Sequence, residues 1–252
     1  PGYIYSRYAN PTVRMFEERL AELEGAEDCR ATASGMAAIH TMLAAPIKPG
    51  ERIVAPRAVF SSVVWILKNV MPKMGVEVVW VDGSDIGQWE KALSKPTRFS
   101  IIETPSNPLL DAVDMRAVAD LTHRAGGEFI VDNVFASPIL QKPLQFGADW
   151  VVYSTTKHMD GQGRTLGGAI LGRKKKIEDD LQQYYRHTGP SMSPFNAWVV
   201  LKGLETMDLR VRRMSDNARK IADRLAENSK VAAVRYPGRS DHPHHNIHAS
   251  QM

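Results

Sequence analysis

The sequence has little cysteine, no long apolar run and no large excess of one charge. Cys29 is the single cysteine in 252 residues, which excludes an internal disulfide and a cysteine metal cluster. No stretch resembles a signal peptide or reaches the roughly 18 consecutive apolar residues of a transmembrane helix. We therefore expect no membrane association and a reducing, cytoplasmic setting.

The small net charge of +4 gives no indication of a polyanionic partner. The one basic run, Arg173 to Lys176, lacks interleaved aromatic residues and is more typical of a solvated helix start than of a nucleic-acid surface. A proline-broken segment near the end lacks the supporting ligands of a metal motif, although it contains His242, His244, His245 and His248. We expect no nucleic-acid partner and no metal.

The composition, 43% hydrophobic and 24% charged, is that of an ordinary globular chain with enough residues for one large core. Pro1 is not an initiator residue, and Met252 follows a polar, histidine-rich segment with no closing helix or strand. We expect the sequence to be part of a longer chain.

Short apolar runs alternate with segments of helical periodicity along most of the chain. Asn10-Pro11 and Gly25 delimit the first helix, and a long amphipathic helix is expected from about 194 to 228 with an interruption near Gly203. The strands are expected at 29–34, 52–55, 76–82, 99–103, 129–132, 150–153 and 167–171. This alternation predicts an α/β fold with a mainly parallel sheet and crossover helices.

Polar residues that follow these strands are the candidate site residues. The run Trp150 to Tyr153 leads directly into Ser154, Thr156 and Lys157. Ligands of α/β sheets bind at such strand ends. The alternative for Lys157 is an ordinary surface lysine.

Two other positions extend this candidate site. Asp132 follows Ile130 and Val131 at the end of another expected strand, where its alternative role is a helix cap or a loop hydrogen bond. Gly35-Met36 forms a small turn before a helix, and free backbone N–H groups at a helix start suit a phosphate.

The first residues form a polar and aromatic lead, GYIYSRYANPT. Tyr5 and Arg7 stand on the same side of an extended segment, so their side chains could converge on one anion. The alternative is a frayed terminus.

Two known motifs are considered and rejected. Ser154-x-x-Lys157 and Ser215-Asp216-Asn217 match elements of penicillin-recognising enzymes, but here the first closes a strand and the second lies in a helical pattern. Gly161-Gln162-Gly163 does not open a helix, so it is no dinucleotide fingerprint. A lysine, a carboxylate and a phosphate cradle together instead indicate pyridoxal 5'-phosphate (PLP).

Five motifs in order, YSRYANPT, SGMAAI, ETPSNPLLDAVD, VDNVFASP and STTKHMDGQGRTLGG, resemble the Cys/Met-metabolism family of PLP-dependent enzymes across the whole chain. The resemblance implies a fold-type-I transferase large domain with a mostly parallel seven-stranded sheet between helices. It implies an N-terminal arm at 1–12, the PLP-binding domain at 13–228, and the start of a connection to an absent C-terminal domain at 229–252.

The resemblance also implies a role for each candidate residue. Lys157 matches the Schiff-base lysine and Asp132 the partner of the pyridine nitrogen. Gly35, Met36, Ser154 and Thr156 match the phosphate ligands, and Asn107 the residue that bonds the phenolic oxygen. Tyr5 and Arg7 match a pair that reaches the phosphate of a neighbouring subunit, so a homodimer or homotetramer is implied.

The sequence departs from the family pattern at three places. Phe60 replaces the tyrosine that stacks on the cofactor; phenylalanine can stack but has no hydroxyl to donate. His158 follows the lysine in place of the common tyrosine. The arginine that binds the substrate α-carboxylate belongs to the C-terminal domain that is absent.

TTKHMDGQGR and TGPSMSPFNAWVVLKGLET most resemble the O-succinylhomoserine sulfhydrylase branch of the family. This implies that O-succinylhomoserine and sulfide are converted to homocysteine and succinate, a step of methionine biosynthesis. Cystathionine γ-synthase and methionine γ-lyase activities remain alternatives, as does a truncated chain that binds cofactor and dimerises without catalysis. The sequence does not indicate whether the substrate is the succinyl or the acetyl ester of homoserine.

Overall fold

A seven-stranded sheet forms the centre of the computed structural model, which describes residues 2–252; Pro1, the first residue of the expected arm, lies outside them. The strand order is β1-β7-β6-β5-β4-β2-β3. β7 runs antiparallel to both of its neighbours, and the pairs among β2 to β6 are parallel. The strands are β1 (Asp28–Thr32), β2 (Arg52–Pro56), β3 (Glu77–Val81), β4 (Phe99–Glu103), β5 (Glu128–Asp132), β6 (Trp150–Ser154) and β7 (Gly168–Gly172). The predicted fold class is confirmed.

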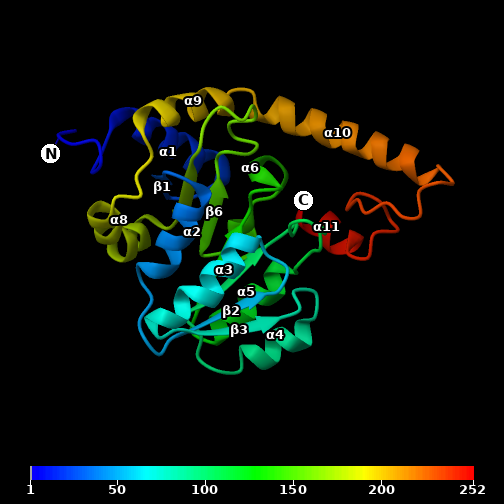
Figure 1. Cartoon of the computed structure of the whole chain (residues 1–252), viewed down its shortest axis with the longest axis horizontal. Coiled ribbons are helices and arrows are strands. Elements are labelled where there is room, and N and C mark those ends of the chain that lie inside the picture. The colour runs from blue at the N-terminus through cyan, green and yellow to red at the C-terminus, as the bar shows by residue number, and fades with distance from the viewer. Residues whose placement is uncertain (1) are drawn as a thin grey trace.

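Helices cover both faces of this sheet (Figure 1). They are α1 (Pro11–Glu24), α2 (Gly35–Ala44), α3 (Ser61–Asn69), α4 (Ile86–Ala92), α5 (Met115–Arg124), α6 (Ser137–Leu140), α7 (Lys174–Lys176), α8 (Gln182–Thr188), α9 (Pro194–Leu204), α10 (Met207–Ala226) and α11 (His245–Gln251). Shorter helical turns are η1 (Met71–Met74), η2 (Pro143–Phe146) and η3 (Ile177–Leu181).

Successive residues of a strand pack into two separate hydrophobic cores, one on each face of the sheet. In β5, Ile130 packs into the core under α2 and α3, whereas Val131 packs into the core under α1, α5 and α9. Neighbouring side chains of a strand point to opposite faces of the sheet. Burial on both faces explains why the strands are continuous apolar runs in the sequence.

The start of α2 lies two residues earlier than the sequence predicts. Ser34 is the N-cap: its Oγ accepts a hydrogen bond from Ala37 N at 3.1 Å. The preceding strand therefore ends at Thr32, and Gly35 and Met36 form the first turn of the helix. This places their N–H groups at a helix N-terminus.

The last part of the chain also differs from the expectation of an irregular segment. The residues after Pro243 include helix α11, which Gln251 holds to α5 by accepting a hydrogen bond from Met115 N at 2.8 Å. His248 Nε2 bonds the Leu110 carbonyl at 2.8 Å. Partners this distant in sequence leave no local signal of the helix.

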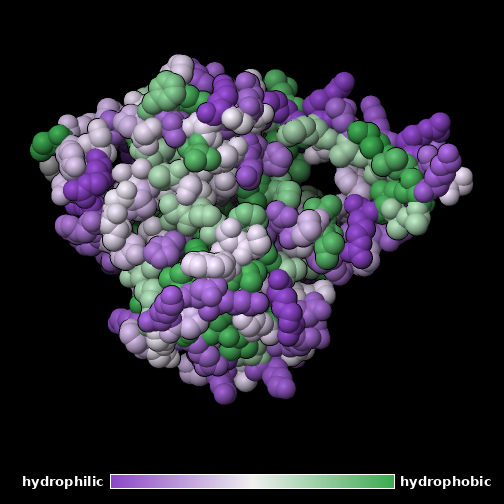
Figure 2. Space-filling model, viewed as in Figure 1, coloured by the Kyte–Doolittle hydropathy of each residue, from purple (hydrophilic) through white to green (hydrophobic). Residues whose placement is uncertain are grey.

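The expected helix at 194–228 consists of α9 and α10, which Figure 1 shows running along one side of the molecule, with α10 extending beyond the sheet. Figure 2 shows apolar side chains exposed where α10 leaves the body. Leu209 and Ile221 are 72% and 60% exposed. In the 20 residues of α10 only Met207, Val211 and Ala222 are buried, whereas five of the 11 residues of α9 are, so α10 is less covered than α9. Over residues 2–252, no helix has both the length and the apolar character required to cross a bilayer.

Candidate active site

A cavity of about 480 Å³ lies beside the carboxyl ends of β4, β5 and β6 and the start of α2. Eight of the ten residues predicted for the site line it: Gly35, Met36, Phe60, Asn107, Asp132, Ser154, Thr156 and Lys157. The topology brings these residues together because parallel strands present their carboxyl ends at one edge of the sheet.

One side of the cavity is suited to an anion. The Ser34 side chain and carbonyl accept from Ala37 N and Ala38 N, which leaves the Gly35 and Met36 N–H groups for a ligand. A Cβ on Gly35 would lie 2.6 Å from Ser154 Cβ. Only glycine therefore allows the helix start to lie this close to the end of β6.

The two hydroxyl groups predicted as phosphate ligands are not equivalent. Thr156 Oγ1 donates to the Gly167 carbonyl at 3.3 Å and accepts from Gly167 N at 3.2 Å. Ser154 Oγ has no hydrogen-bond partner among residues 2–252, so it is the hydroxyl better able to donate to an anion.

The opposite side of the cavity holds two carboxyl groups. Asp132 Oδ1 accepts one hydrogen bond, from Val134 N at 3.2 Å. Burial, followed by the negative charge of Glu103, raises the pKa of Asp132 to about 8. Burial raises the pKa of Glu103 to about 7, although its Oε2 accepts from Phe60 N at 2.7 Å. A cation in the cavity would stabilise the charged form of both carboxylates.

Glu103 is absent from the sequence-based prediction. It follows the apolar strand Phe99–Ile102 as Asp132 follows Phe129–Val131, so the same signal could have identified it. The hydrogen bonds that Glu103 accepts from the backbone of Phe60 and Asn107 tie it to two predicted site residues.

Lys157 is an exposed residue in the turn directly after β6, and it borders the same cavity. Its backbone N–H donates to the Ser154 carbonyl at 3.3 Å, and its carbonyl accepts from Gly161 N at 2.7 Å. The adjacent His158 also lines the cavity, and burial, with the charge of Arg210, lowers the pKa of its imidazole. His158 is therefore neutral at pH 7.

Tyr5 and Arg7 do not reach this cavity within their own chain. Ser6–Tyr8 forms a turn, so the expectation of an extended segment is wrong there. The Arg7 guanidinium lies over the Tyr5 and Tyr8 rings, 5.1 and 4.8 Å from their centroids, and donates to the Arg186 carbonyl. The turn is favoured over an extended segment because it places two aromatic rings against the guanidinium, a cation–π contact that stabilises the positive charge.

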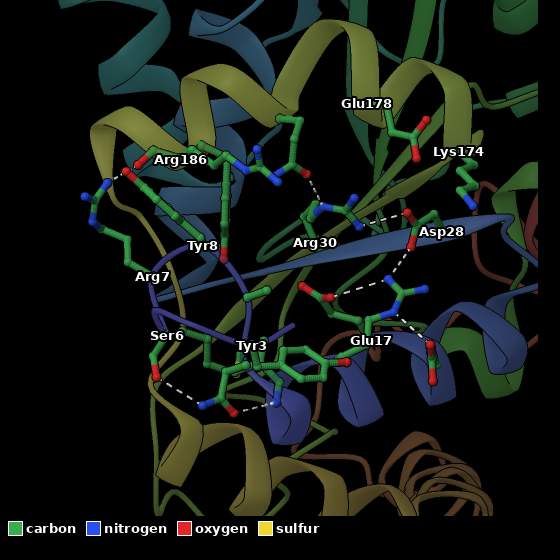
Figure 3. A pocket seen from close by; sticks show the side chains of 18 of the residues that line it. Tyr3, Ser6, Arg7, Tyr8, Glu17, Asp28, Arg30, Lys174, Glu178 and Arg186 are labelled. Carbon is green, nitrogen blue, oxygen red and sulfur yellow. Dashed lines mark hydrogen bonds and ion pairs between the residues drawn. The ribbon is translucent and has the colours of Figure 1, made fainter. Parts of the chain in front are cut away.

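Arg7 lines a second cavity of about 450 Å³ (Figure 3). Charges of both signs surround it: Arg14 forms an ion pair with Asp28 at 2.6 Å, and Arg30 pairs with the same carboxylate at 2.8 Å. Glu17 points into this cluster in Figure 3 and accepts from Ala31 N at 2.8 Å. Asp28 is thus paired with two arginines, whereas Asp132 in the first cavity has no cationic partner.

Two alternatives from the sequence can be compared with the structure. Ser154 ends a strand, and Ser215 lies inside α10 with its hydroxyl donating to the Val211 carbonyl, unlike the positions that acyl-serine chemistry requires. Within residues 2–252, no three His, Cys, Asp or Glu side chains are grouped as metal ligands. His244 Nδ1 instead accepts from Ala112 N at 3.1 Å.

PLP fits the residues that line the first cavity. The Gly35 and Met36 N–H groups at the start of α2 and the Ser154 hydroxyl suit a phosphate, Phe60 offers an aromatic face, and Asp132 lacks a cationic partner. With the mostly parallel sheet, this donor set defines a PLP-dependent enzyme of fold type I.

The chain belongs to the family described as Cys/Met metabolism PLP-dependent enzyme, whose model matches residues 1–252. It is 52% identical to the O-succinylhomoserine sulfhydrylase of Mycobacterium tuberculosis, over 99% of this chain and 62% of that protein. It is 42% identical to the O-succinylhomoserine sulfhydrylase of Pseudomonas aeruginosa, over 100% of this chain and 62% of that protein.

A solved structure of cystathionine gamma synthase from Xanthomonas oryzae pv. oryzae, in complex with aminoacrylate and cysteine, superposes with a TM-score of 0.95. It is 38% identical and is matched over 100% of this chain and 65% of that chain. The chain thus spans about two thirds of the length of the proteins that it resembles.

Proposed function

We propose that the whole protein, with PLP bound, exchanges the succinyl ester of O-succinylhomoserine for sulfide and releases homocysteine and succinate. One observation carries this proposal: Lys157, Asp132 and the start of α2 border a single cavity. The names of the two sulfhydrylases, 52% and 42% identical, support the choice of substrates.

Each part of the cavity is proposed to hold one part of the cofactor. The Gly35 and Met36 N–H groups and Ser154 Oγ hold the phosphate, with Thr156 beside them. Phe60 lies against the ring, and Asn107 donates to the phenolic oxygen. Asp132 holds the proton on the ring nitrogen, and Lys157 Nζ is the point of covalent attachment.

When bound, PLP takes up the electron pair released when a proton leaves the substrate Cα. Lys157 Nζ, which borders the cavity, would accept that proton and hold it for later return. After a second proton leaves Cβ, succinate departs from Cγ with the electrons of the C–O bond. Sulfide then forms a C–S bond at Cγ, and the protons return to Cβ and Cα.

Two related reactions compete with this proposal. Cysteine as the nucleophile would give cystathionine, and the similarity to a cystathionine gamma synthase structure favours this as the second candidate. Loss of succinate without a replacing nucleophile, followed by reaction with water, would give a keto acid and ammonia beside succinate. Phe60 has no hydroxyl with which to move a proton, so none of these reactions assigns it an acid or base role.

Product analysis of the complete protein tests the proposal. O-Succinylhomoserine is supplied with sulfide, with cysteine and with no thiol, and O-acetylhomoserine is supplied with sulfide in parallel. We expect homocysteine as the main product and the succinyl ester as the better substrate. Cystathionine or keto acid as the main product would overturn the assignment. A cofactor spectrum that does not respond to either ester would favour a non-catalytic chain.

A further inference from the structure

The turn that carries Lys157 is bound from outside by one side chain of α10. Arg210 Nη1 donates to the His158 carbonyl at 2.8 Å, and Nη2 donates to the Met159 carbonyl at 3.3 Å. The same guanidinium donates to the Gly203 carbonyl at 2.8 Å and to Thr206 Oγ1 at 3.1 Å. It therefore joins the Lys157 turn to the junction between α9 and α10.

Two glycines allow this junction to approach the turn. A Cβ on Gly161, which has φ +72°, would lie 2.0 Å from Arg210 Nη1. A Cβ on Gly203 would lie 2.1 Å from the Met159 carbonyl oxygen. The guanidinium and the two backbones are thus in direct contact, with no room for a side chain between them.

Residues that follow the turn provide the hydrogen bonds to its buried carboxylate. Asp160 accepts from Arg164 N at 2.7 Å, from Arg164 Nε at 2.9 Å and from Gln162 N at 3.3 Å. The carbonyl groups of His158 and Met159, in contrast, accept their hydrogen bonds from Arg210. Removing the guanidinium would leave these carbonyls without that partner.

Arg210 acts here through its geometry, not through an ion pair. Within residues 2–252 it lies within ion-pair distance of no carboxylate. Burial, with the positive charge of Arg164, lowers its pKa, and only Asp160 opposes this. The planar fork of arginine can bond several carbonyls at once, which a lysine ammonium cannot reproduce in the same geometry.

We propose that Arg210 is a positioning residue for Lys157, holding the turn so that the lysine amine stays at the cavity. This inference rests on the proposed attachment of the cofactor at Lys157, but it does not depend on which substrate the protein uses.

The test compares Arg210→Ala and Arg210→Lys in the complete protein. Arg213→Ala is the matched control, because Arg213 lies on the same helix, is exposed and makes no hydrogen bond or ion pair with the described residues. Two quantities are measured: amide hydrogen exchange at 157–161 in the apoprotein, and the affinity for PLP.

We expect Arg210→Ala to speed exchange in the turn and to weaken PLP binding, each by about 10- to 100-fold, the effect of losing hydrogen bonds from a charged donor. Arg210→Lys should give an intermediate effect, and Arg213→Ala none. Equal effects of Arg210→Ala and the control would overturn the proposal. So would a lower melting temperature with unchanged turn exchange and unchanged PLP affinity.

A second variant keeps the test decisive if Arg210→Ala folds poorly. Gly161→Ala should also weaken PLP binding, because the new methyl group meets the guanidinium. In the Gly161→Ala background, Arg210→Lys should weaken PLP binding by a smaller factor than it does in the parent protein, because the two changes act on one contact. If the two changes lower the PLP affinity independently of each other, the proposal is contradicted. Failure to form homocysteine would refute the proposed function without affecting these outcomes.

Discussion

Asp132 and Glu103 place two carboxyl groups at the ends of neighbouring strands, beside one cavity. A buried carboxylate without a cation is costly, and the two groups repel each other when both are charged. Their raised pKa values, about 8 and about 7, express that cost. A protonated ring nitrogen at Asp132 would supply the missing positive charge.

The raised pKa of Asp132 gives the apoprotein a pH dependence that Asp132→Asn should remove. The folded-state pKa of about 8 exceeds the unfolded value of about 3.9. The contribution of Asp132 to stability is thus fully present below pH 4 and is lost as the pH rises through 8. Relative to the parent, the Asn variant should become more stable between pH 5 and pH 8, by urea denaturation of the apoprotein.

Asp120→Asn, at an exposed position on α5, is the control for this experiment. The same Asp132→Asn change should weaken PLP binding, because the amide cannot balance the charge of the ring. If the free energy of unfolding of Asp132→Asn changes with pH in the same way as that of the parent between pH 5 and 8, the raised pKa does not belong to Asp132.

Eight of the predicted site residues lie together, and they are those whose position the chain itself determines. Lys157, Asp132 and Ser154 follow apolar strands, and the sheet topology brings their side chains to one cavity. Tyr5 and Arg7 could not be placed in the same way, because their proposed ligand belongs to another subunit. Within one chain, Arg7 packs against its own aromatic neighbours.

At the scale of elements, a buried polar network joins the ends of β4, β5 and β6 below the cavity. Asn133 Nδ2 donates to the Tyr153 hydroxyl at 2.7 Å, and Asn133 Oδ1 accepts from Gln141 Nε2 at 2.8 Å. Gln141 Nε2 also donates to the Thr104 carbonyl at 2.8 Å. The Tyr153 hydroxyl donates to Glu24 of α1. The network holds together the strands that carry Asp132 and Ser154.

Tyr153→Phe should destabilise the fold by about 1–3 kcal/mol, because it leaves the buried Glu24 carboxyl without its hydrogen-bond donor and removes one of the acceptors of Asn133 Nδ2, which keeps the Gln141 carbonyl. Both groups are fully buried, so water cannot replace the hydroxyl. Denaturant unfolding measures this change. Tyr184→Phe is the control, since that hydroxyl makes no hydrogen bond with residues 2–252. A loss no larger than that of the control would show that the network contributes nothing.

The seven strands were predictable because burial on both faces makes each a short apolar run. The short helices were not. Helix α6 has four residues, and α11 depends on the bond between Gln251 and Met115, which are distant in sequence. Short helices are marginal alone and form through tertiary contacts.

At the scale of the whole molecule, the chain presents a cofactor cavity and, elsewhere, an N-terminal segment with Tyr5 and Arg7. We propose that residues 1–12 act as an arm that completes the phosphate site of a second copy, in a homodimer or homotetramer. The further proposed division is a PLP-binding domain at 13–228 and a connection at 229–252.

This arrangement predicts complementation between two inactive variants of the complete protein. Arg7→Ala removes the arm's cation, and Lys157→Ala removes the attachment point. A mixed dimer has one intact site, built from the normal arm of one copy and the normal lysine of the other. Activity should therefore return when the two variants are unfolded together and refolded. No recovery in mixed dimers, isolated with two different affinity tags, would refute the shared site.

The most direct measurement is mass spectrometry of the complete protein after incubation with PLP and reduction with borohydride. We expect one peptide to carry the phosphopyridoxyl group and fragmentation to place it on Lys157. Lys157→Ala should abolish the label. A label on another lysine, or a protein that binds PLP without a reducible bond, would contradict the assignment of the site.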